Sequence, residues 1–216
     1  MNEQPPLPSL FQALLRGLYG SLAAATLGHM LVTACLPWGA ELWLKGPYGP
    51  HFFDISLYLG VLYGGIALSL SRRPGPACAA AAAAFLGIAL PMTVLTHAAR
   101  WGMDTNAQPT LAWYYAVIAT HTLATWGTTL GLGALLCPQR RWRGAIFAAL
   151  GSLAGYLILE VFLRLVPSYA QGRWNPKSFI PSPVDLLTGM LIGAGIGAGI
   201  YLATPRPTVP AKEPSS

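Results

Sequence analysis

The sequence predicts an all-α fold: a polytopic integral membrane helical bundle with about six transmembrane helices. Of its 216 residues, 54% are hydrophobic and only 9% are charged. A water-soluble domain carries about 25% charged residues, so these few charges cannot cover a water-facing surface. Apolar runs of the ~20 residues that a membrane-spanning helix needs follow one another along the chain. We therefore expect residues 1–204 to form a single transmembrane domain.

The first three helices are predicted at about residues 15–37, 53–71 and 76–98. The first ends at Pro37 and the second before Arg72, because prolines and charged turns stop helices. The third opens with an alanine-rich stretch. Pro91 lies inside it and should kink it, leaving one carbonyl to line a cavity or to find another donor.

The last three helices are predicted at about residues 111–136, 144–166 and 184–203. Each is followed closely by a proline, at positions 138, 167 and 205. Residues 205–216 are rich in proline, lysine, glutamate and serine, so we expect a disordered cytoplasmic tail.

The positive charges predict how the helices are oriented. The net charge of +6 does not indicate nucleic-acid binding, because the arginines form short clusters between apolar runs, as in 72–73 and 140–143. Such clusters mark cytoplasmic loops. With six helices, these clusters, Arg16 and the C-terminal tail fall on one side, and nearly all the acids fall on the other. Both termini are therefore predicted to be cytoplasmic.

Two further features predict a bacterial cytoplasmic (inner) membrane. Arginine far exceeds lysine, and alanine, glycine and proline are abundant, which is typical of GC-rich bacteria. The N-terminus lacks the basic start and cleavage site of a secretory signal peptide, so the first apolar run is expected to stay in the protein.

An internal repeat relates the first predicted hairpin to the last. A shift of 131 residues aligns residues 20–23 with 151–154, both Gly-Ser-Leu-Ala, and Asp54 with Asp185. The same shift aligns His29 with Glu160. The copies would share their orientation, as in parallel-repeat transporters. Helices 76–98 and 111–136 would then form a diverged middle hairpin.

Four ionisable residues inside the predicted helices are the candidates for a ligand or metal site: His29, His97, His121 and Glu160. An ionisable residue at membrane depth indicates a function by default. Each has a threonine or tyrosine at helical spacing, so we expect polar stripes that face a common interior. Structural roles are the alternatives. Glu160 would pair with Arg164, His97 would face water, and the other histidines would bond between helices.

A shared site in the outer half of the bundle would suit three kinds of chemistry. Imidazoles with a carboxylate bind a transition metal such as zinc, and two histidines on facing helices ligate a haem. Intramembrane acids and histidines also relay protons or bind polar solutes. Asp54 and Asp185 would open the second helix of each repeat, near the mouth of the site. Aspartate there is also an ordinary helix cap.

Gly189, Gly193 and Gly197 recur every four residues, the small-residue pattern of closely packed helices. The function that these features favour is a small transporter-like or accessory membrane protein and not an enzyme. A metal- or haem-binding enzyme or redox subunit is one alternative. The other is a structural subunit whose glycine faces dock to another membrane protein or to a second copy. Beyond these, the only expected partner is the lipid bilayer.

Overall fold

The computed structural model describes residues 9–42, 49–102, 111–166 and 181–204, without the side chains of 36–42, 49–52, 95–102, 111–114 and 117. Within these ranges all regular structure is helical. The elements are α1 (Leu10–Leu42), α2 (Gly49–Ser71), α3 (Pro74–Gly102), α4 (Leu111–Leu136), the 3-10 turn η1 (Pro138–Arg140), α5 (Arg141–Leu165) and α7 (Pro183–Ala203).

Pro37 and Pro91 lie well past the first turn of helices that continue beyond them. We expected the first helix to end at Pro37, and the backbone of α1 instead stays helical to Leu42. In α3 the helix continues through Pro91. A proline removes one backbone donor, and the rest of the hydrogen-bond ladder still holds the helix. Gly87, four residues before Pro91, lines a cavity of about 380 Å³ between α3 and α4.

Among the described residues, five helices are long and apolar enough to cross a membrane: α1, α2, α3, α5 and α7. The sixth, α4, has 26 residues, which is also long enough for a span. However, five threonines and a histidine fall between Thr120 and Thr129. A polar segment in the middle of α4 therefore distinguishes it from its neighbours.

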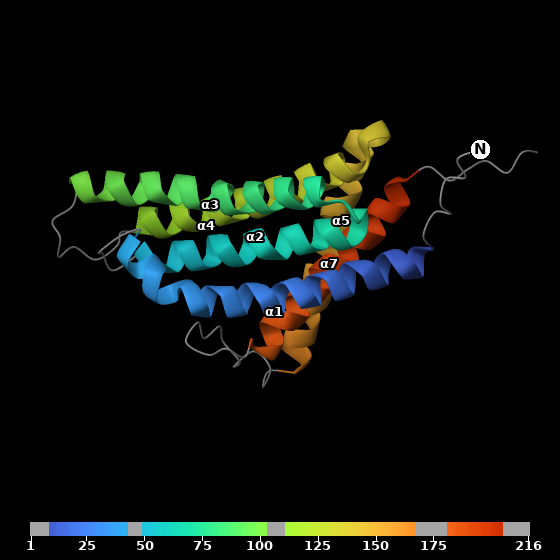
Figure 1. Cartoon of the computed structure of the whole chain (residues 1–216), viewed down its shortest axis with the longest axis horizontal. Coiled ribbons are helices and arrows are strands. Elements are labelled where there is room, and N and C mark those ends of the chain that lie inside the picture. The colour runs from blue at the N-terminus through green and yellow to red at the C-terminus, as the bar shows by residue number, and fades with distance from the viewer. Residues whose placement is uncertain (1–8, 43–48, 103–110, 167–180, 205–216) are drawn as a thin grey trace, which may run out of the picture.

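Each helix packs along the next one in the chain, and α7 returns to pack along α1, so the six described helices close into a ring. Figure 1 shows α1 to α4 side by side, with α5 and α7 inclined to them. Among neighbours in the ring, α5 and α7 make the closest contact and α3 and α4 the loosest. Much of the core comes from α2, whose Leu62, Tyr63, Ile66 and Ala67 are all buried.

Glycines let α7 pack closely against two helices at once. Its four-residue glycine repeat faces α1, where Gly193 approaches the backbone of Gly17 and Gly197 approaches that of Ala13. Another pair of glycines in α7 faces α5, and there Gly195 approaches the backbone of Gly151. Without side chains between them, the backbones come close enough for dispersion and weak polar contacts to act between helices.

The first and last hairpins begin and pair at equivalent positions. Helix α1 begins at Leu10 and α5 at Arg141, 131 residues later. Gly20 of α1 approaches the carbonyl of Gly65, and Gly151 of α5 approaches the carbonyl of Gly195. After the 131-residue shift, position 195 corresponds to 64, one residue from Gly65. The two hairpins therefore have nearly the same register.

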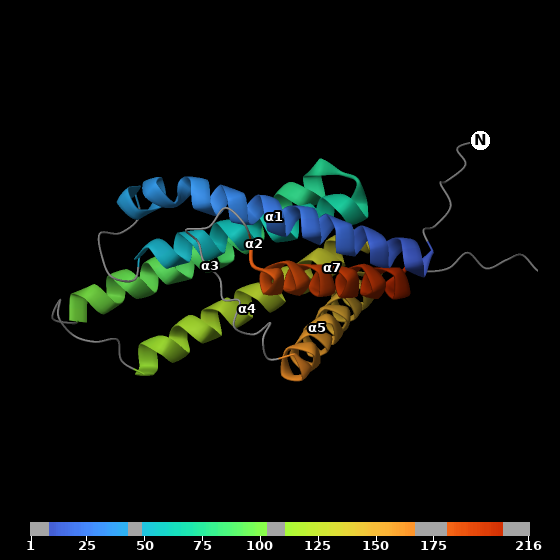
Figure 2. The same cartoon turned by 90° about the horizontal axis from the view of Figure 1, so that it is seen from below.

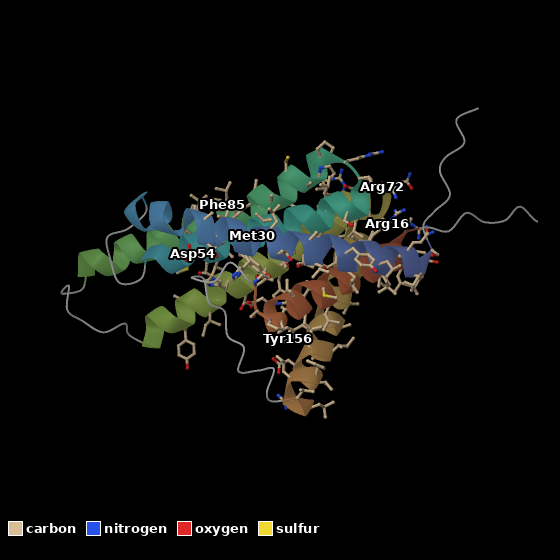
Figure 3. The ribbon with its side chains drawn as sticks, turned by 60° about the horizontal axis from the view of Figure 1, so that its bottom comes forward. Arg16, Met30, Asp54, Arg72, Phe85 and Tyr156 are labelled. Atoms are coloured by element: carbon tan, nitrogen blue, oxygen red, sulfur yellow. The ribbon has the colours of Figure 1, made fainter. Side chains whose placement is uncertain are left out.

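The two ends of the bundle differ in charge. Six arginines gather where α1 begins and where the turns after α2 and α4 lie: Arg16, Arg72, Arg73, Arg140, Arg141 and Arg143. The described carboxylates, those of Asp54, Glu160 and Asp185, belong to the opposite half. Figure 3 shows Arg16 and Arg72 near one end and Asp54 toward the other.

We expect Gly195→Ala to destabilise the bundle and Gly131→Ala to leave it unchanged or more stable. A Cβ at Gly195 would collide with the backbone of Gly151, whereas one at Gly131 meets nothing within 4 Å. Overpacking costs about 1–3 kcal/mol, and an unopposed Gly→Ala change in a helix gains up to about 1 kcal/mol. Unfolding of the detergent-purified variants by SDS measures both. Equal stability of the two variants would contradict this packing.

Candidate functional site

Helices α4 and α5 are in backbone contact at one end and diverge from there. Next to η1, Gly133 of α4 and Gly144 of α5 approach each other's backbone. Figure 2 shows the two helices separating away from this turn, with α7 beside them. A cavity of about 380 Å³ lies between them, lined by His121, Thr122, Thr125, Trp126, Thr129, Ser152, Leu153, Tyr156 and Ile192.

The wall formed by α4 is a polar stripe with a spacing of four residues: His121, Thr125 and Thr129. Thr129 donates its hydroxyl proton to the carbonyl of Thr125, with an oxygen–oxygen distance of 2.9 Å. The hydroxyl of Tyr63, which is buried on α2, lies 2.8 Å from Thr129 Oγ1 and 3.3 Å from the Thr125 carbonyl. These bonds join α2 to α4 and fix the stripe toward the cavity.

The wall formed by α5 carries a second stripe with the same spacing. Ser152 and Tyr156 line the cavity, and Glu160 follows one turn later. The Tyr156 hydroxyl donates to Glu160 Oε1 at 3.0 Å. Arg164 Nε lies 3.9 Å from Glu160 Oε2, and the Arg164 side chain is 84% exposed. Glu160 therefore pairs within its own helix, the structural alternative, and an exposed pair of this kind is weak.

His29 lies apart from this cavity. Its side chain is 1% exposed, and the neighbouring Gly28 packs against Tyr58 and Val61 of α2. His29 and Glu160 are equivalent in the sequence repeat, yet one is buried between helices and the other is part-exposed. Within the described residues, Nδ1 of His29 and Nε2 of His121 have no hydrogen-bond partner, although both rings make other interactions.

The two aspartates have different roles. Ser182 is the N-cap of α7: its Oγ accepts from the Asp185 backbone N–H at 3.1 Å and donates to the Asp185 carboxylate at 2.6 Å. Asp185 therefore lies in the first turn of α7 and supports the cap, while the serine is the capping residue. Asp54 does not open its helix as predicted. Helix α2 begins at Gly49, so Asp54 lies more than one turn inside it, and it is 4% exposed.

The predicted four-residue site can be followed only in part, because the structure describes three of its four side chains. Among the described residues, no three histidine, cysteine, aspartate or glutamate side chains come together as metal ligands would. The side chain of His97 lies outside the described residues. The structure instead brings His121 together with hydroxyl and aromatic groups of α4 and α5. Sequence reasoning missed Thr129 and Ser152, which extend the two stripes by one turn, and Tyr63, whose role depends on a distant helix.

Comparison with known proteins gives no matching family model, no matching curated protein and no matching solved structure.

A double-mutant cycle of Tyr63→Phe and Thr129→Val tests the bond between α2 and α4. We expect the two changes to couple by about 0.6 kcal/mol, with about 1.7 kcal/mol as the upper bound for such bonds between helices. Unfolding by SDS of the wild type, both single variants and the double variant gives the coupling energy. Strictly additive effects would contradict the bond.

Proposed function

We propose that the chain spans a bacterial cytoplasmic membrane six times. Five described helices have the required length and apolarity. Both α3 and α5 begin at the arginine-rich end, so the chain must return across the bundle between them, and α4 is the segment that does so. The threonines of α4 do not prevent it from crossing the membrane, because some of their hydroxyl groups donate to backbone carbonyls of the same helix and so need no water. Thr122, for example, donates to Ile118 at 2.8 Å.

The arginine-rich end faces the cytoplasm in this proposal. Six arginines gather there, and the described carboxylates lie in the other half. Clusters of arginine and lysine next to membrane spans are retained on the cytoplasmic side. The cavity between α4 and α5 then lies toward the outer leaflet, because Tyr156 and His121 are far along their helices from η1.

The function that the structure supports best is the binding of a small polar solute in this cavity, as a transporter-like or accessory membrane protein would do. The convergence of two polar stripes around about 380 Å³ carries this proposal. That volume falls in the range of small-molecule pockets. Hydroxyl, imidazole and indole groups that converge at membrane depth are costly unless they serve packing or a ligand.

The hydrogen bonds of the lining favour a solute that carries donors. Thr122 donates its proton to a carbonyl of α4, and Tyr156 donates its proton to Glu160. The oxygens of these two groups are left to accept. Trp126 and Tyr156 add aromatic rings, which attract cations. A small amine or organic ammonium ion therefore suits the cavity better than an anion.

The alternative of a structural subunit loses its original support. The glycines of α7 that suggested a docking face are in contact with α1 and α5 of the same chain. Helix association through those residues is therefore already used inside the bundle.

Cysteine labelling tests both the water access and the charge preference of the cavity. In a background without Cys35, Cys78 and Cys137, we expect Thr125→Cys to react with the cationic reagent methanethiosulfonate-ethylammonium in intact membranes. Each reagent's rate is divided by its rate with a free thiol in solution. By this measure the cationic reagent should react faster than the anionic ethylsulfonate reagent, because the cavity lining offers hydrogen-bond acceptors.

The matched control is Ile158→Cys, on the opposite face of α5 from Tyr156 and 58% exposed. In the proposed bilayer this position faces lipid, and its thiol should stay unmodified. If Thr125→Cys is as unreactive as the control, the cavity is filled by lipid and the solute proposal fails. Preference for the anionic reagent would contradict the assignment of a donor-bearing solute.

A further inference from the structure

A second cavity, of about 550 Å³, lies at the arginine-rich end of the bundle. Three parts of the chain that are far apart in sequence form it: the turn between α2 and α3, the turn η1, and the end of α7. Its polar lining includes Ser71, Arg73, Gln139, Arg140 and Thr204. The remaining lining is largely apolar and comes from Leu70, Pro76, Leu135, Leu136, Cys137, Pro138, Ile200 and Ala203.

Two arginines reach this cavity from different turns. Arg73 follows α2 and Arg140 ends η1, 67 residues later. Neither forms an ion pair with a described carboxylate, and the Glu160–Arg164 pair lies in the other half of the bundle. Two positively charged side chains that line one cavity favour a bound anion over a cation. The geometry therefore points to an anionic ligand.

The turn that carries Arg73 is held in a fixed conformation. Ser71 Oγ accepts from the Arg73 backbone N–H at 3.1 Å and donates to the carbonyl of Ala67 at 2.6 Å. Arg72 has a φ of 55°, a left-handed conformation that is unfavourable for a residue with a Cβ. A turn with this conformation starts α3 directly after α2 and leaves Arg73 at the edge of the cavity.

We propose that this cavity binds the phosphate group of an anionic phospholipid. Guanidinium groups bind phosphate oxygens with paired hydrogen bonds, and basic pockets between membrane helices bind anionic headgroups. The apolar side of the cavity suits the start of the acyl chains, which free phosphate lacks. Trp142, 82% exposed beside Arg141 and Arg143, is a residue type that favours the membrane interface. Assigning this phospholipid to the cytoplasmic leaflet rests on the orientation proposed above.

Native mass spectrometry of the full chain in mild detergent tests this site. The probes are phosphatidylglycerol, phosphatidylcholine with the same acyl chains, and inorganic phosphate. The wild type should bind one phosphatidylglycerol about tenfold or more tightly than phosphatidylcholine. Arg73→Gln/Arg140→Gln should weaken that binding by about 30-fold, since each arginine near an anionic headgroup contributes about fivefold.

The matched control is Arg141→Gln/Arg143→Gln, which removes the same charge from the same end without touching the cavity lining. It should change the affinity by less than about threefold, because only screened long-range attraction is lost. Arg73→Lys/Arg140→Lys keeps the charge and loses the paired hydrogen bonds, so it should bind with intermediate affinity. This variant tests the site even if the glutamine variant does not fold.

Equal losses in the cavity variant and the control would overturn the proposal, because a diffuse positive surface would then explain the binding. Equal affinity for the two lipids would also overturn it. If millimolar inorganic phosphate displaces phosphatidylglycerol, the cavity is a site for free phosphate, and the assignment to a lipid is wrong.

Discussion

The close approach of α7 to α1 and α5 is the contact on which the rest of the structure depends. In the proposed bilayer, burying apolar side chains between helices gains little, because lipid tails are as apolar as leucine. Close contact between helix backbones is then the main source of stability, and it requires glycine at the contact. Gly193 and Gly197 provide it toward α1, and Gly195 provides it toward α5. These contacts join the first hairpin to the last and close the ring of helices.

The same constraint explains where the ring is open. Gly133 and Gly144 bring α4 and α5 together next to η1, but no further glycine pair holds them beyond it. The helices diverge there, and the space between them contains hydroxyl, imidazole and aromatic groups instead of packed leucine. Most of the threonines and the histidine that α4 carries between positions 120 and 129 thus lie at the cavity. On the opposite side of α4, a hydrogen bond between Tyr63 and Thr129 holds α4 to α2 where close contact with α5 is missing.

Much of the fold follows from local patterns, whereas the site does not. Apolar runs and flanking prolines predicted all six helices to within a few residues at most ends, because length and polarity are properties of a single segment. Pro37 failed as a stop, since one lost hydrogen bond is too little to end a helix. Spacing within α4 and α5 predicted which polar residues share a face. It could not predict that His121 lines the cavity and His29 does not, because helix rotation and pairing depend on distant glycines. The repeat aligned His29 with Glu160, yet their different neighbours give them different environments.

We propose that α4 crosses the membrane and that the arginine-rich end is cytoplasmic. Asp104→Cys and Gln139→Cys, on the two sides of α4 in a cysteine-free background, test both parts in one experiment. A membrane-impermeant maleimide is added to right-side-out and to inverted membrane vesicles. We expect labelling of position 104 only in right-side-out vesicles and of position 139 only in inverted ones. Labelling of both positions from the same side would exclude α4 as a span, and the reverse pattern would contradict the orientation.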